Sequence, residues 1–472
     1  MGAVVPALLY LLYVDHYSLN VPVADDWNVI PIASAAVHHK ITLNELWQQY
    51  GDTRLFVGFL LFSVFGLFDH LNEKMIILFS AGIFIATFAM LLLLVRSYLG
   101  QRFTFLPVFS IGIVWFSLAD VQNSLWSFQL AWYFVVFGFV AMAYFLLVPS
   151  RRRNRFFVLA ILAAVAASFA EVQGFVVWPV GLISLLWSSP WRRRVYFETA
   201  IWVSAAILTT LFYLHGFIFA ADTQICIVEG GKKASCSLTF GLLHPGQLAR
   251  FFLVLVGNVV PTNPGTYVVA HELLGAAICV VACWIVAQSV RKRRVGANPL
   301  PVLLISFGFL FDLMLALSRL GEGLLGAGLN RYTMPNIVVL VSIVVYGWAH
   351  LPNLTTAWRR QTTSDRLKIL GGTAFLAFFV VQSVLATQFG ITNARAFKAS
   401  SEAVARVVVN LDRIPSAEQA CYFQSVVVGP SYSVLEQARN TAIQEQLSLF
   451  RRGLQQMYLD EGPPHIARCD RP

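Results

Sequence analysis

Charged residues are scarce in this chain of 472 residues. Asp, Glu, Lys and Arg make up only 12% of it, whereas 57% of the residues are hydrophobic. A soluble globular chain carries about 25% charged residues, so this composition excludes a soluble enzyme. Disorder is excluded as well, because disordered chains are poor in aromatic residues and this one has 38 Phe and 12 Trp. The composition therefore indicates a membrane protein.

Metal-binding cysteine patterns are also missing. The chain has six Cys, with no Cys-x-x-Cys pair and no mixed Cys/His spacing of the kind that holds zinc. The formal net charge of +10 raises the question of nucleic acid. In a membrane protein, however, basic residues gather in cytoplasmic loops, and here they cluster between apolar stretches. We therefore expect no nucleic-acid partner.

Apolar runs long enough to cross a bilayer recur along the chain. A helix of about 20 apolar residues spans the hydrocarbon. No small-residue cleavage site precedes Asp15, so the first run is interpreted as an anchor rather than a signal peptide. We expect an all-α polytopic fold with about eleven transmembrane helices, at 3–19, 74–95, 104–118, 125–148, 156–170, 174–188, 195–219, 266–289, 298–318, 334–353 and 369–388.

The basic clusters predict the topology. Half of the Lys and Arg residues lie in five clusters, near residues 96–102, 151–155, 192–194, 291–294 and 359–368. All five fall on the cytoplasmic side only if two shorter apolar runs, 54–68 and 249–260, do not cross. These two are predicted to be interfacial or re-entrant, the first of them in the first outside loop. The N-terminus is then cytoplasmic and the C-terminus extracytoplasmic.

The composition changes near residue 389, which predicts a membrane domain over 1–389 and a small extracytoplasmic domain over 390–472. In the tail, 421–428 has the pattern of a strand and 433–453 that of a helix. The topology places two cysteine pairs outside, where disulfides persist: Cys226 with Cys236, and Cys421 with Cys469. Both pairs can bridge. Cys279 and Cys283 lie in a predicted span and are expected to be packing residues.

Polar residues that are not part of the basic clusters gather in five places, all on the predicted outside face. A single outward-facing cavity is the simplest interpretation, and polar groups at such depth are functional candidates. They are Asp25, Asp26 and Trp27; Asp52 and Arg54; Asp120, Gln122, Asn123 and Trp126; Glu171 and Gln173; and Arg319, Glu322, Asn330, Arg331 and Tyr332.

The adjacent carboxylates Asp25 and Asp26 allow two interpretations. Partial burial and mutual repulsion raise the pKa of at least one carboxyl in such a pair, which suits a general base or a divalent-ion ligand. Alternatively, one of them caps a helix that begins at about Trp27, since Asp is a favoured N-cap. A cap needs only one of the two.

Three isolated arginines lie on the outside face, where the positive-inside rule does not favour them. Guanidinium groups match phosphate oxygens, so the phosphate of a lipid is one candidate partner. Internal carboxylates are the other. The arginines and their internal candidates are Arg54 with Asp52, Arg319 with Glu322 or with Asp312 inside a span, and Arg331.

Amides beside indoles suit a sugar, and Gln122, Asn123 and Trp126 lie within one helical turn of each other. The amides can hold hydroxyl groups while the ring stacks on a sugar face. The alternative is an aromatic belt at the membrane interface with polar neighbours. Glu171 is either part of the same cavity or an ordinary turn residue.

The ordered set of motifs resembles a known group of enzymes. The segments are ADDW at 24–27, GDTR at 51–54, QNSLWSFQ at 122–129, VVWPVGL at 176–182, SRLGEG at 318–323 and NRY at 330–332. Together they resemble bacterial polytopic glycosyltransferases of the GT-C superfamily, over roughly residues 10–340. Relatives more often carry a His/Glu-His-Arg run at 52–54, of which this chain retains Arg54 and an acidic neighbour.

The resemblance implies transfer of a sugar from a polyprenyl-phosphate carrier to a cell-envelope glycan, lipid or protein, at the outer face of the bacterial cytoplasmic membrane. It implies Asp25 or Asp26 as general base, with inversion. Some such enzymes bind a divalent cation at the acidic motif and many need none. Arg54, Arg319 and Arg331 would bind the donor phosphate. Trp27, Asp52, Gln122, Asn123, Trp126, Glu171, Glu322 and Tyr332 would contact sugar or acceptor. A lipid or glycolipid flippase is the alternative function.

Overall fold

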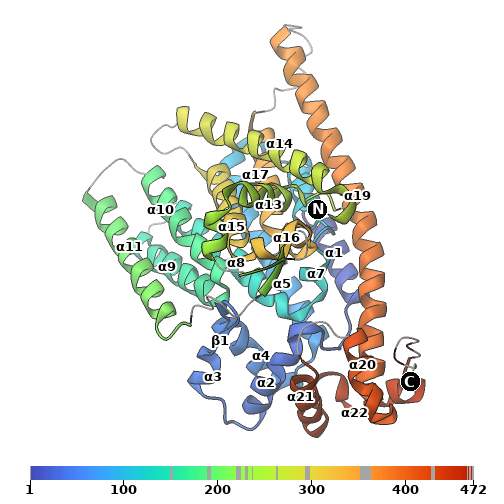
Figure 1. Ribbon diagram of the computed structural model, residues 1–472. Helices are drawn as coiled ribbons and strands as arrows, with labels where there is room; N and C mark the ends of the chain where they lie inside the picture. Colours follow the sequence, from blue (N-terminus) through green and yellow to red (C-terminus); the bar gives the residue numbers. More distant parts are fainter. Residues whose placement is uncertain are drawn as a thin grey trace. The chain divides into compact units, whose positions relative to one another are not determined.

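The structure of the protein is a computed structural model. It describes residues 2–148, 152–188, 193–218, 225–228, 232–235, 238–261, 264–292, 298–350, 363–426, 431–464, 466 and 469. These residues form a chain that is almost entirely helical (Figure 1). By contacts, the chain divides into two compact units. Unit 1 comprises Met1–Tyr10, Phe84–Val121 and Phe134–Ile391, and unit 2 comprises Leu11–Ile83, Gln122–Tyr133 and Thr392–Pro472.

All eleven apolar runs predicted from the sequence form helices. Eight of the described helices are long and apolar enough to cross a membrane. Together with the composition, they make this an all-α, multi-pass membrane protein. The eight are contained in α5 (Glu73–Leu99), α8 (Leu130–Leu147), α9 (Arg153–Ala170), α11 (Arg193–Leu214), α14 (Pro264–Arg291), α15 (Leu300–Arg319), α17 (Met334–His350) and α19 (Thr363–Val409).

Shorter apolar helices occupy the remaining predicted runs. Three correspond to expected spans: α1 (Val4–Tyr17), α6 (Phe105–Trp115) and α10 (Val177–Ser188). The other two are α4 (Phe56–Asp69) and α13 (Pro245–Gly257), at the runs that the charge pattern excludes as crossings. All five have between 11 and 14 residues, fewer than the approximately 20 that a bilayer requires. Helix length therefore does not separate the three expected spans from the two interfacial helices, and the count of eleven crossings stays a prediction.

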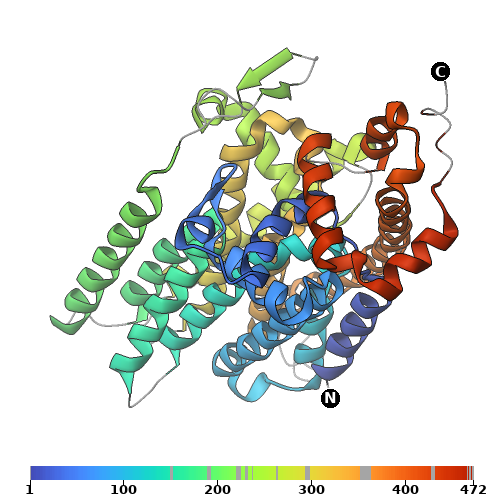
Figure 2. The same cartoon turned by 90° about the horizontal axis from the view of Figure 1, so that it is seen from below.

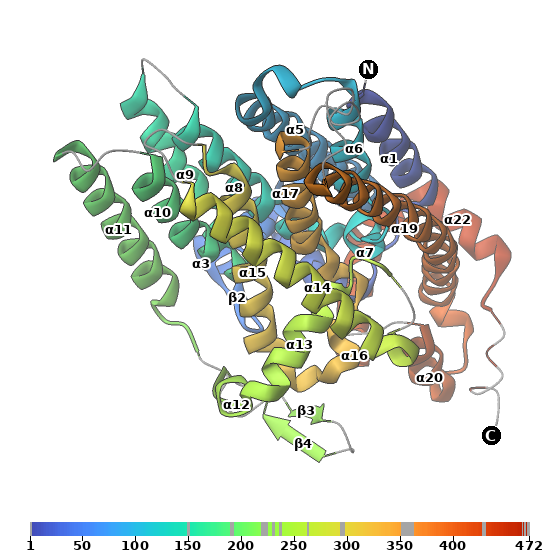
Figure 3. The same cartoon turned by 90° about the horizontal axis from the view of Figure 1, so that it is seen from above.

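Unit 1 is a bundle whose helices pack closely at small residues. Helix α13 lies against α14, and a Cβ on Gly275 would meet the carbonyl oxygen of Leu253 at 1.9 Å. Glycine is therefore required where these two backbones approach. Elsewhere, the rings of Phe139 on α8 and Phe307 on α15 stack at 4.1 Å between centroids. Figure 3 shows α9, α10 and α11 side by side.

The connecting segments of unit 1 contain short elements. A two-stranded antiparallel hairpin of β3 (Ile225–Val228) and β4 (Lys232–Ser235) is visible as arrows in Figure 2. The others are η2 (Gly100–Arg102), η4 (Val172–Val176), α12 (Leu238–Leu243), η5 (Leu320–Glu322), α16 (Gly323–Ala327) and η6 (Asn330–Thr333). Helix η4 packs against α15.

Unit 2 collects segments that are far apart in the sequence. Its first part contains η1 (Ala24–Val29), α2 (Ile30–Val37), α3 (Leu43–Trp47), β1 (Gln49–Tyr50), β2 (Thr53–Arg54) and α4. Its second part, with α7 (Val121–Leu125) at the boundary, contains η3 (Ser127–Gln129). Its third part contains the end of α19, η7 (Leu411–Arg413), α20 (Ser416–Val426), α21 (Tyr432–Glu445), η8 (Ser448–Phe450) and α22 (Arg452–Glu461).

The C-terminal tail differs in detail from its sequence pattern. Helix α19 runs without a break through residue 390 to Val409. The strand predicted over 421–428 is wrong, because its described part, up to Val426, belongs to helix α20. The adjacent residues Tyr422 and Phe423 are both buried, whereas a strand with one solvated face would bury only one of them. Tertiary packing thus overrides the β propensity of the run. The helix predicted over 433–453 is present as α21, η8 and the start of α22.

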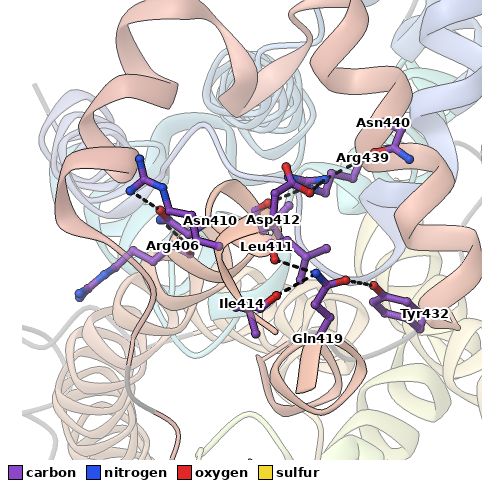
Figure 4. Close-up of polar contacts among 11 residues, drawn as sticks. Arg406, Asn410, Leu411, Asp412, Ile414, Gln419, Tyr432, Arg439 and Asn440 are labelled. Carbon is purple, nitrogen blue, oxygen red and sulfur yellow. Dashed lines mark hydrogen bonds and ion pairs between the residues drawn. The ribbon is translucent and has the colours of Figure 1, made fainter. Parts of the chain in front are cut away.

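A buried arginine organises this tail (Figure 4). Arg439 on α21 is 4% exposed. Its guanidinium donates to both carboxylate oxygens of Asp412, at 3.1 and 2.6 Å, and its Nε donates to the carbonyl of Val408 at 2.7 Å. The bidentate geometry satisfies the buried charge. Helix α20 is tied in by Gln419, whose amide donates to the carbonyls of Leu411 and Ile414.

Candidate functional site

Asp26 is the central residue of a polar network in unit 2. Its side chain is 1% exposed. One carboxylate oxygen accepts the Ser127 hydroxyl at 2.6 Å and the other accepts the backbone N–H of Val23 at 2.9 Å. Asp26 thus joins η1, which follows α1, to η3, which precedes α8. The Trp126 indole strengthens the same junction by donating to the carbonyl of Val23 at 3.1 Å.

The helix-capping interpretation of the acidic pair holds only in part. The helix begins at Ala24 rather than Trp27, and Asp26 stands inside it at the third position. From there its carboxylate accepts the N–H of Val23 at the helix N-terminus, the reciprocal half of a capping box. Asp25 takes no part in this cap. The cap therefore accounts for one carboxylate of the pair and leaves the other for a different role.

Burial raises the pKa of Asp26 from 3.8 to about 7. The neighbouring Asp25 carboxylate raises the pKa further, while the hydrogen bonds from Ser127 and Val23 lower it. Removal from water is the largest of these causes because it penalises the charged form. This carboxyl group therefore holds its proton to a higher pH than an exposed aspartate does.

Asp25 has a different environment from its neighbour. It is half-buried, and one of its carboxylate oxygens accepts the Tyr50 hydroxyl at 2.8 Å. The Tyr50 oxygen in turn accepts the side-chain amide of Asn28 at 2.9 Å. Burial, followed by the charge of Asp25, raises the pKa of Tyr50, so its proton stays available for this hydrogen bond. Asp25 is thus held in place while remaining accessible from solvent.

Glu73 is a functional candidate that the sequence analysis missed. It lies at the start of α5, is 0% exposed, and is close enough to Asp26 to interact with it electrostatically. Its backbone N–H donates to the Asn20 side chain at 2.8 Å. Its carboxyl group also interacts with the Ser127 hydroxyl, the group that donates to Asp26. Glu73 directly precedes the predicted span 74–95, where charged residues are usually exposed, so the sequence does not predict its burial.

The GDTR segment forms a tight hairpin. Strands β1 and β2 pair antiparallel, with Tyr50 opposite Thr53, around Gly51, whose φ of 57° favours glycine. Asp52 is half-buried in the turn. Arg54 is 4% exposed, donates to the carbonyl of Trp47, and stacks on the Trp47 ring at 5.0 Å. The hairpin places Tyr50 beside Asp25 and fixes the arginine.

The predicted sugar-binding aromatics are packing residues in this structure. Trp27 is 0% exposed and Trp126 is 7% exposed. The Trp126 ring stacks on Phe128 at 6.0 Å, in addition to its bond to Val23. Beside them, Asn123 is 1% exposed and Gln122 is half-buried. The two indoles shape the surroundings of η1, and neither offers an open ring face.

A second polar group lies in unit 1. Arg319 at the end of α15 donates to Glu322 at 3.3 Å, and the Tyr332 hydroxyl donates to the other Glu322 oxygen at 3.5 Å. Arg331 donates to the Tyr332 oxygen at 3.2 Å and stacks over its ring at 5.1 Å. The structure thus brings SRLGEG and NRY together. The internal pairing of Arg319 with Glu322 is correct.

Asp312 does not pair with Arg319. It is 0% exposed within α15, and neither carboxyl oxygen has a hydrogen-bond partner among the described residues. The nearby amide of Asn336 instead donates to the carbonyl of Leu255 at 3.0 Å. Of the two internal partners offered for Arg319, the structure contains Glu322 and not Asp312.

Glu171 occupies the turn between α9 and η4. It is 9% exposed and accepts the N–H of Val172 at 3.3 Å, which caps η4. The turn is tight because a Cβ on Gly174 would meet the carbonyl oxygen of Ala167 at 1.9 Å. The turn interpretation accounts for these contacts. Glu171 therefore lies in unit 1, near α15 through η4.

The predicted site residues thus form two groups, one in each unit. Whether they share one outward-facing cavity stays a prediction. Unit 2 holds Asp25, Asp26, Trp27, Asp52, Arg54, Gln122, Asn123 and Trp126, and unit 1 holds Glu171, Arg319, Glu322, Arg331 and Tyr332.

Of the two predicted disulfides, the structure contains the Cys421–Cys469 bond, with 5.6 Å between the Cα atoms. It joins α20 to the end of the chain. Cys236 lies outside the described residues, so the Cys226–Cys236 bond stays a prediction. Cys279 and Cys283, both in α14, are free thiols.

No family model matches the chain, and no curated protein matches it. Among solved structures, it is similar to the archaeal oligosaccharyltransferase AglB from Archaeoglobus fulgidus, in complex with an inhibitory peptide and a dolichol-phosphate. The sequence identity is 12% and the TM-score 0.42, over 91% of this chain and 60% of that one. This chain thus spans less than two thirds of the oligosaccharyltransferase. A likeness at this level gives no information on activity.

Proposed function

We propose that the protein is a GT-C glycosyltransferase of the bacterial cytoplasmic membrane. It moves a sugar from a polyprenyl-phosphate carrier to a cell-envelope glycan, lipid or protein on the outer face. The observation that carries the proposal is the acidic pair between α1 and α2: a half-buried carboxylate, Asp25, beside a buried one, Asp26, in a network that reaches two other segments of the chain through Tyr50 and Ser127. Paired carboxyl groups in unlike environments are typical of acid–base sites.

Asp25 is the general base in this proposal. It is half-buried, whereas Asp26 is 1% exposed and both of its oxygens accept hydrogen bonds. Asp25 removes the proton from an acceptor hydroxyl, and the hydroxyl oxygen forms a bond to the anomeric carbon. The bond from that carbon to the phosphate oxygen breaks, its electron pair leaves with the polyprenyl phosphate, and the configuration inverts.

Asp26 and Glu73 are positioning residues in this scheme. Asp26 holds the backbone of η1 through Val23 and links it to Ser127. Because two buried carboxylates in proximity cannot both be charged at reasonable cost, the Asp26 and Glu73 groups are expected to carry at least one proton between them. A proton on this pair reduces the electrostatic repulsion between Asp26 and the Asp25 carboxylate. Asp25 can then keep the position that the Tyr50 hydroxyl gives it.

Arginines would stabilise the departing phosphate. Charge develops on the leaving group in the transition state, and preorganised guanidinium groups lower its energy. Arg54 is fixed by Trp47, and Arg331 by Tyr332, so both are preorganised. Arg319 is already paired with Glu322 and would have to share its donors with the phosphate.

A divalent cation at the acidic pair fits these residues poorly. The two Asp26 oxygens face hydrogen-bond donors, namely Ser127 and the Val23 N–H. In the part of the chain that the structure describes, no group of three or more His, Cys, Asp and Glu residues has the arrangement of a metal site. The proposed mechanism therefore routes no step through a metal.

The C-terminal tail, placed outside by the proposed topology, is a candidate for acceptor docking. Helix α21 lies against α2 and η1 (Figure 1). Glu445 accepts the Ser34 hydroxyl at 2.6 Å and contacts His38 at 3.1 Å. An acceptor bound on the tail would thus lie in the same unit as Asp25. Deleting the tail should impair transfer more than donor hydrolysis; equal loss of both would count against docking.

The experiment that tests the proposal is release of polyprenyl phosphate from a panel of polyprenyl-phosphate sugars. Purified protein in detergent is mixed with each donor and with membrane extract as acceptor source. Turnover of one donor, together with sugar transfer to a product, establishes the reaction class and identifies the sugar. Absence of turnover with every donor, by protein that is folded and binds lipid phosphate, contradicts it.

Asp312 is the observation that favours the alternative, a lipid or glycolipid flippase. An ionisable group inside a span marks a transport pathway by default, and this one is fully buried without a hydrogen-bonded partner among the described residues. A flippase would lose transbilayer lipid movement in Asp312→Asn and keep it in Asp25→Asn. The glycosyltransferase proposal expects the opposite order for sugar transfer.

A further inference from the structure

Arginines gather where α9 and α11 begin. The described members are Arg152, Arg153, Arg155, Arg193 and Arg194, which we call the arginine cluster, and all five are exposed. Helices α9 and α11 contact each other and lie in the same group of helices in Figure 3. The cluster belongs to unit 1 and takes no part in the chemistry proposed above.

A buried carboxylate organises the cluster. Glu198, whose side chain is 7% exposed, accepts two hydrogen bonds from Arg153, at 3.1 and 2.8 Å, and one from Arg194 at 2.8 Å. Arg194 also donates to Asn154 at 2.8 Å, which ties the two helix starts together. The side chains of Arg153 and Arg194 remain 43% and 55% exposed. Two of the five guanidinium groups pair with this carboxylate, so the cluster keeps a strong net positive charge.

Exposed apolar side chains lie directly beneath the cluster on both helices. On α11, Phe197 follows Arg193 by one helical turn and is 67% exposed. On α9, Leu159 follows Arg155 by one turn and is 40% exposed, and Leu162 is 56% exposed. Residues four apart share a helix face. Each of the two faces therefore carries a guanidinium group above an apolar surface.

We propose that the arginine cluster binds the phosphate of an anionic phospholipid whose acyl chains lie along α9 and α11. Guanidinium groups match phosphate oxygens in geometry and charge, and basic pockets between membrane helices recognise anionic head groups. A soluble phosphate would use the arginines alone. A phospholipid uses both features, because its phosphate meets the arginines while its acyl chains cover the exposed apolar faces below Arg155 and Arg193.

Native mass spectrometry of the purified full chain in detergent tests this site. Phosphatidylglycerol and phosphatidylcholine of equal chain length are titrated, and the affinity of the first bound lipid is measured. The test variant is Arg155→Gln/Arg193→Gln, which leaves the Glu198 network intact. The matched control is Arg291→Gln/Lys292→Gln, which removes two exposed positive charges at the end of α14. Glycerol phosphate, which lacks acyl chains, is added as a competitor.

The wild type is expected to prefer phosphatidylglycerol. Since each basic residue near an anionic head group is worth about fivefold in affinity, the test variant should lose roughly 25-fold and the control less than about threefold. Glycerol phosphate should not compete. Equal affinity of the wild type for both lipids, or equal losses in the two variants, would overturn the proposal. Effective competition by glycerol phosphate would identify a site for soluble phosphate and overturn it as well.

Discussion

Replacing Asp26 by Asn is expected to remove the part of the pH dependence of stability that Asp26 contributes, while the buried Glu73 keeps its own. Burial raises the pKa of Asp26 from 3.8 to about 7 in the folded protein. Between these pH values the folded state binds a proton that the unfolded state releases, so stability falls as pH rises from about 4 to about 7 and levels off above it. One proton contributes about 1.4 kcal/mol per pH unit. The total is about 4 kcal/mol.

Asparagine keeps the contacts and removes the titration. Its Oδ1 can accept the Val23 N–H, while its Nδ2 donates to the Ser127 hydroxyl oxygen, so both bonded groups remain satisfied. The variant should therefore fold. Its contribution to the free energy of unfolding should not change with pH, because it carries no ionisable group at this position.

Thermal unfolding of detergent-solubilised protein at pH 5, 6, 7 and 8 measures the effect. From pH 5 to 7 the wild type should lose about 2.3 kcal/mol relative to Asp26→Asn, a difference in Tm of about 2 °C for a chain of this length. Asp25→Asn is the control, because it keeps the buried Asp26 carboxyl; it should retain most of the pH dependence, reduced by the loss of the Asp25 charge that helps to raise the pKa of Asp26. Parallel curves for the wild type and Asp26→Asn would refute the reasoning.

Three further predictions concern other contacts. Tyr50→Phe removes the hydroxyl that donates to Asp25. Initial rates of transfer should fall roughly tenfold with little change in Tm. An unchanged rate would show that this hydrogen bond has no role in transfer. Arg439→Met leaves the Val408 carbonyl without its donor, while the exposed Asp412 carboxylate is solvated, and should destabilise the tail by about 1 to 2 kcal/mol, seen as faster proteolysis. Reducing Cys421–Cys469, which closes a separation of 48 residues, should cost about 4 kcal/mol; an unchanged Tm on reduction would contradict this.

The membrane helices could be predicted from the sequence because the signal is local. Each apolar run needs no partner elsewhere in the chain to be recognised, and all eleven predicted runs are helices in the structure. The secondary structure of the C-terminal tail is less predictable from the sequence. Its 421–428 run has β-branched and aromatic residues, and the packing of Tyr422 and Phe423 against distant segments decides in favour of a helix. Such contacts are not visible in a window of eight residues.

The candidate site was predictable in its residue types and less so in their roles. Adjacent Asp25 and Asp26 stand out in the sequence, but their unlike burial follows from η3, a hundred residues away, through Ser127. Glu73 gave no signal because a carboxylate at the end of an apolar run is usually solvated. Trp126 beside two amides is typical of a sugar-binding site. In the structure its indole N–H donates to the Val23 carbonyl, and the residue is buried.

Single-turnover release of polyprenyl phosphate from an active donor, compared between Asp25→Asn and Asp26→Asn, tests the central claim most directly. Removal of a general base costs about 10²–10⁴ in rate, so Asp25→Asn should lose at least about a hundredfold at unchanged donor affinity. Asp26→Asn should retain much more of the rate, because its contacts survive. Full activity in Asp25→Asn would contradict the assignment of Asp25 as the base.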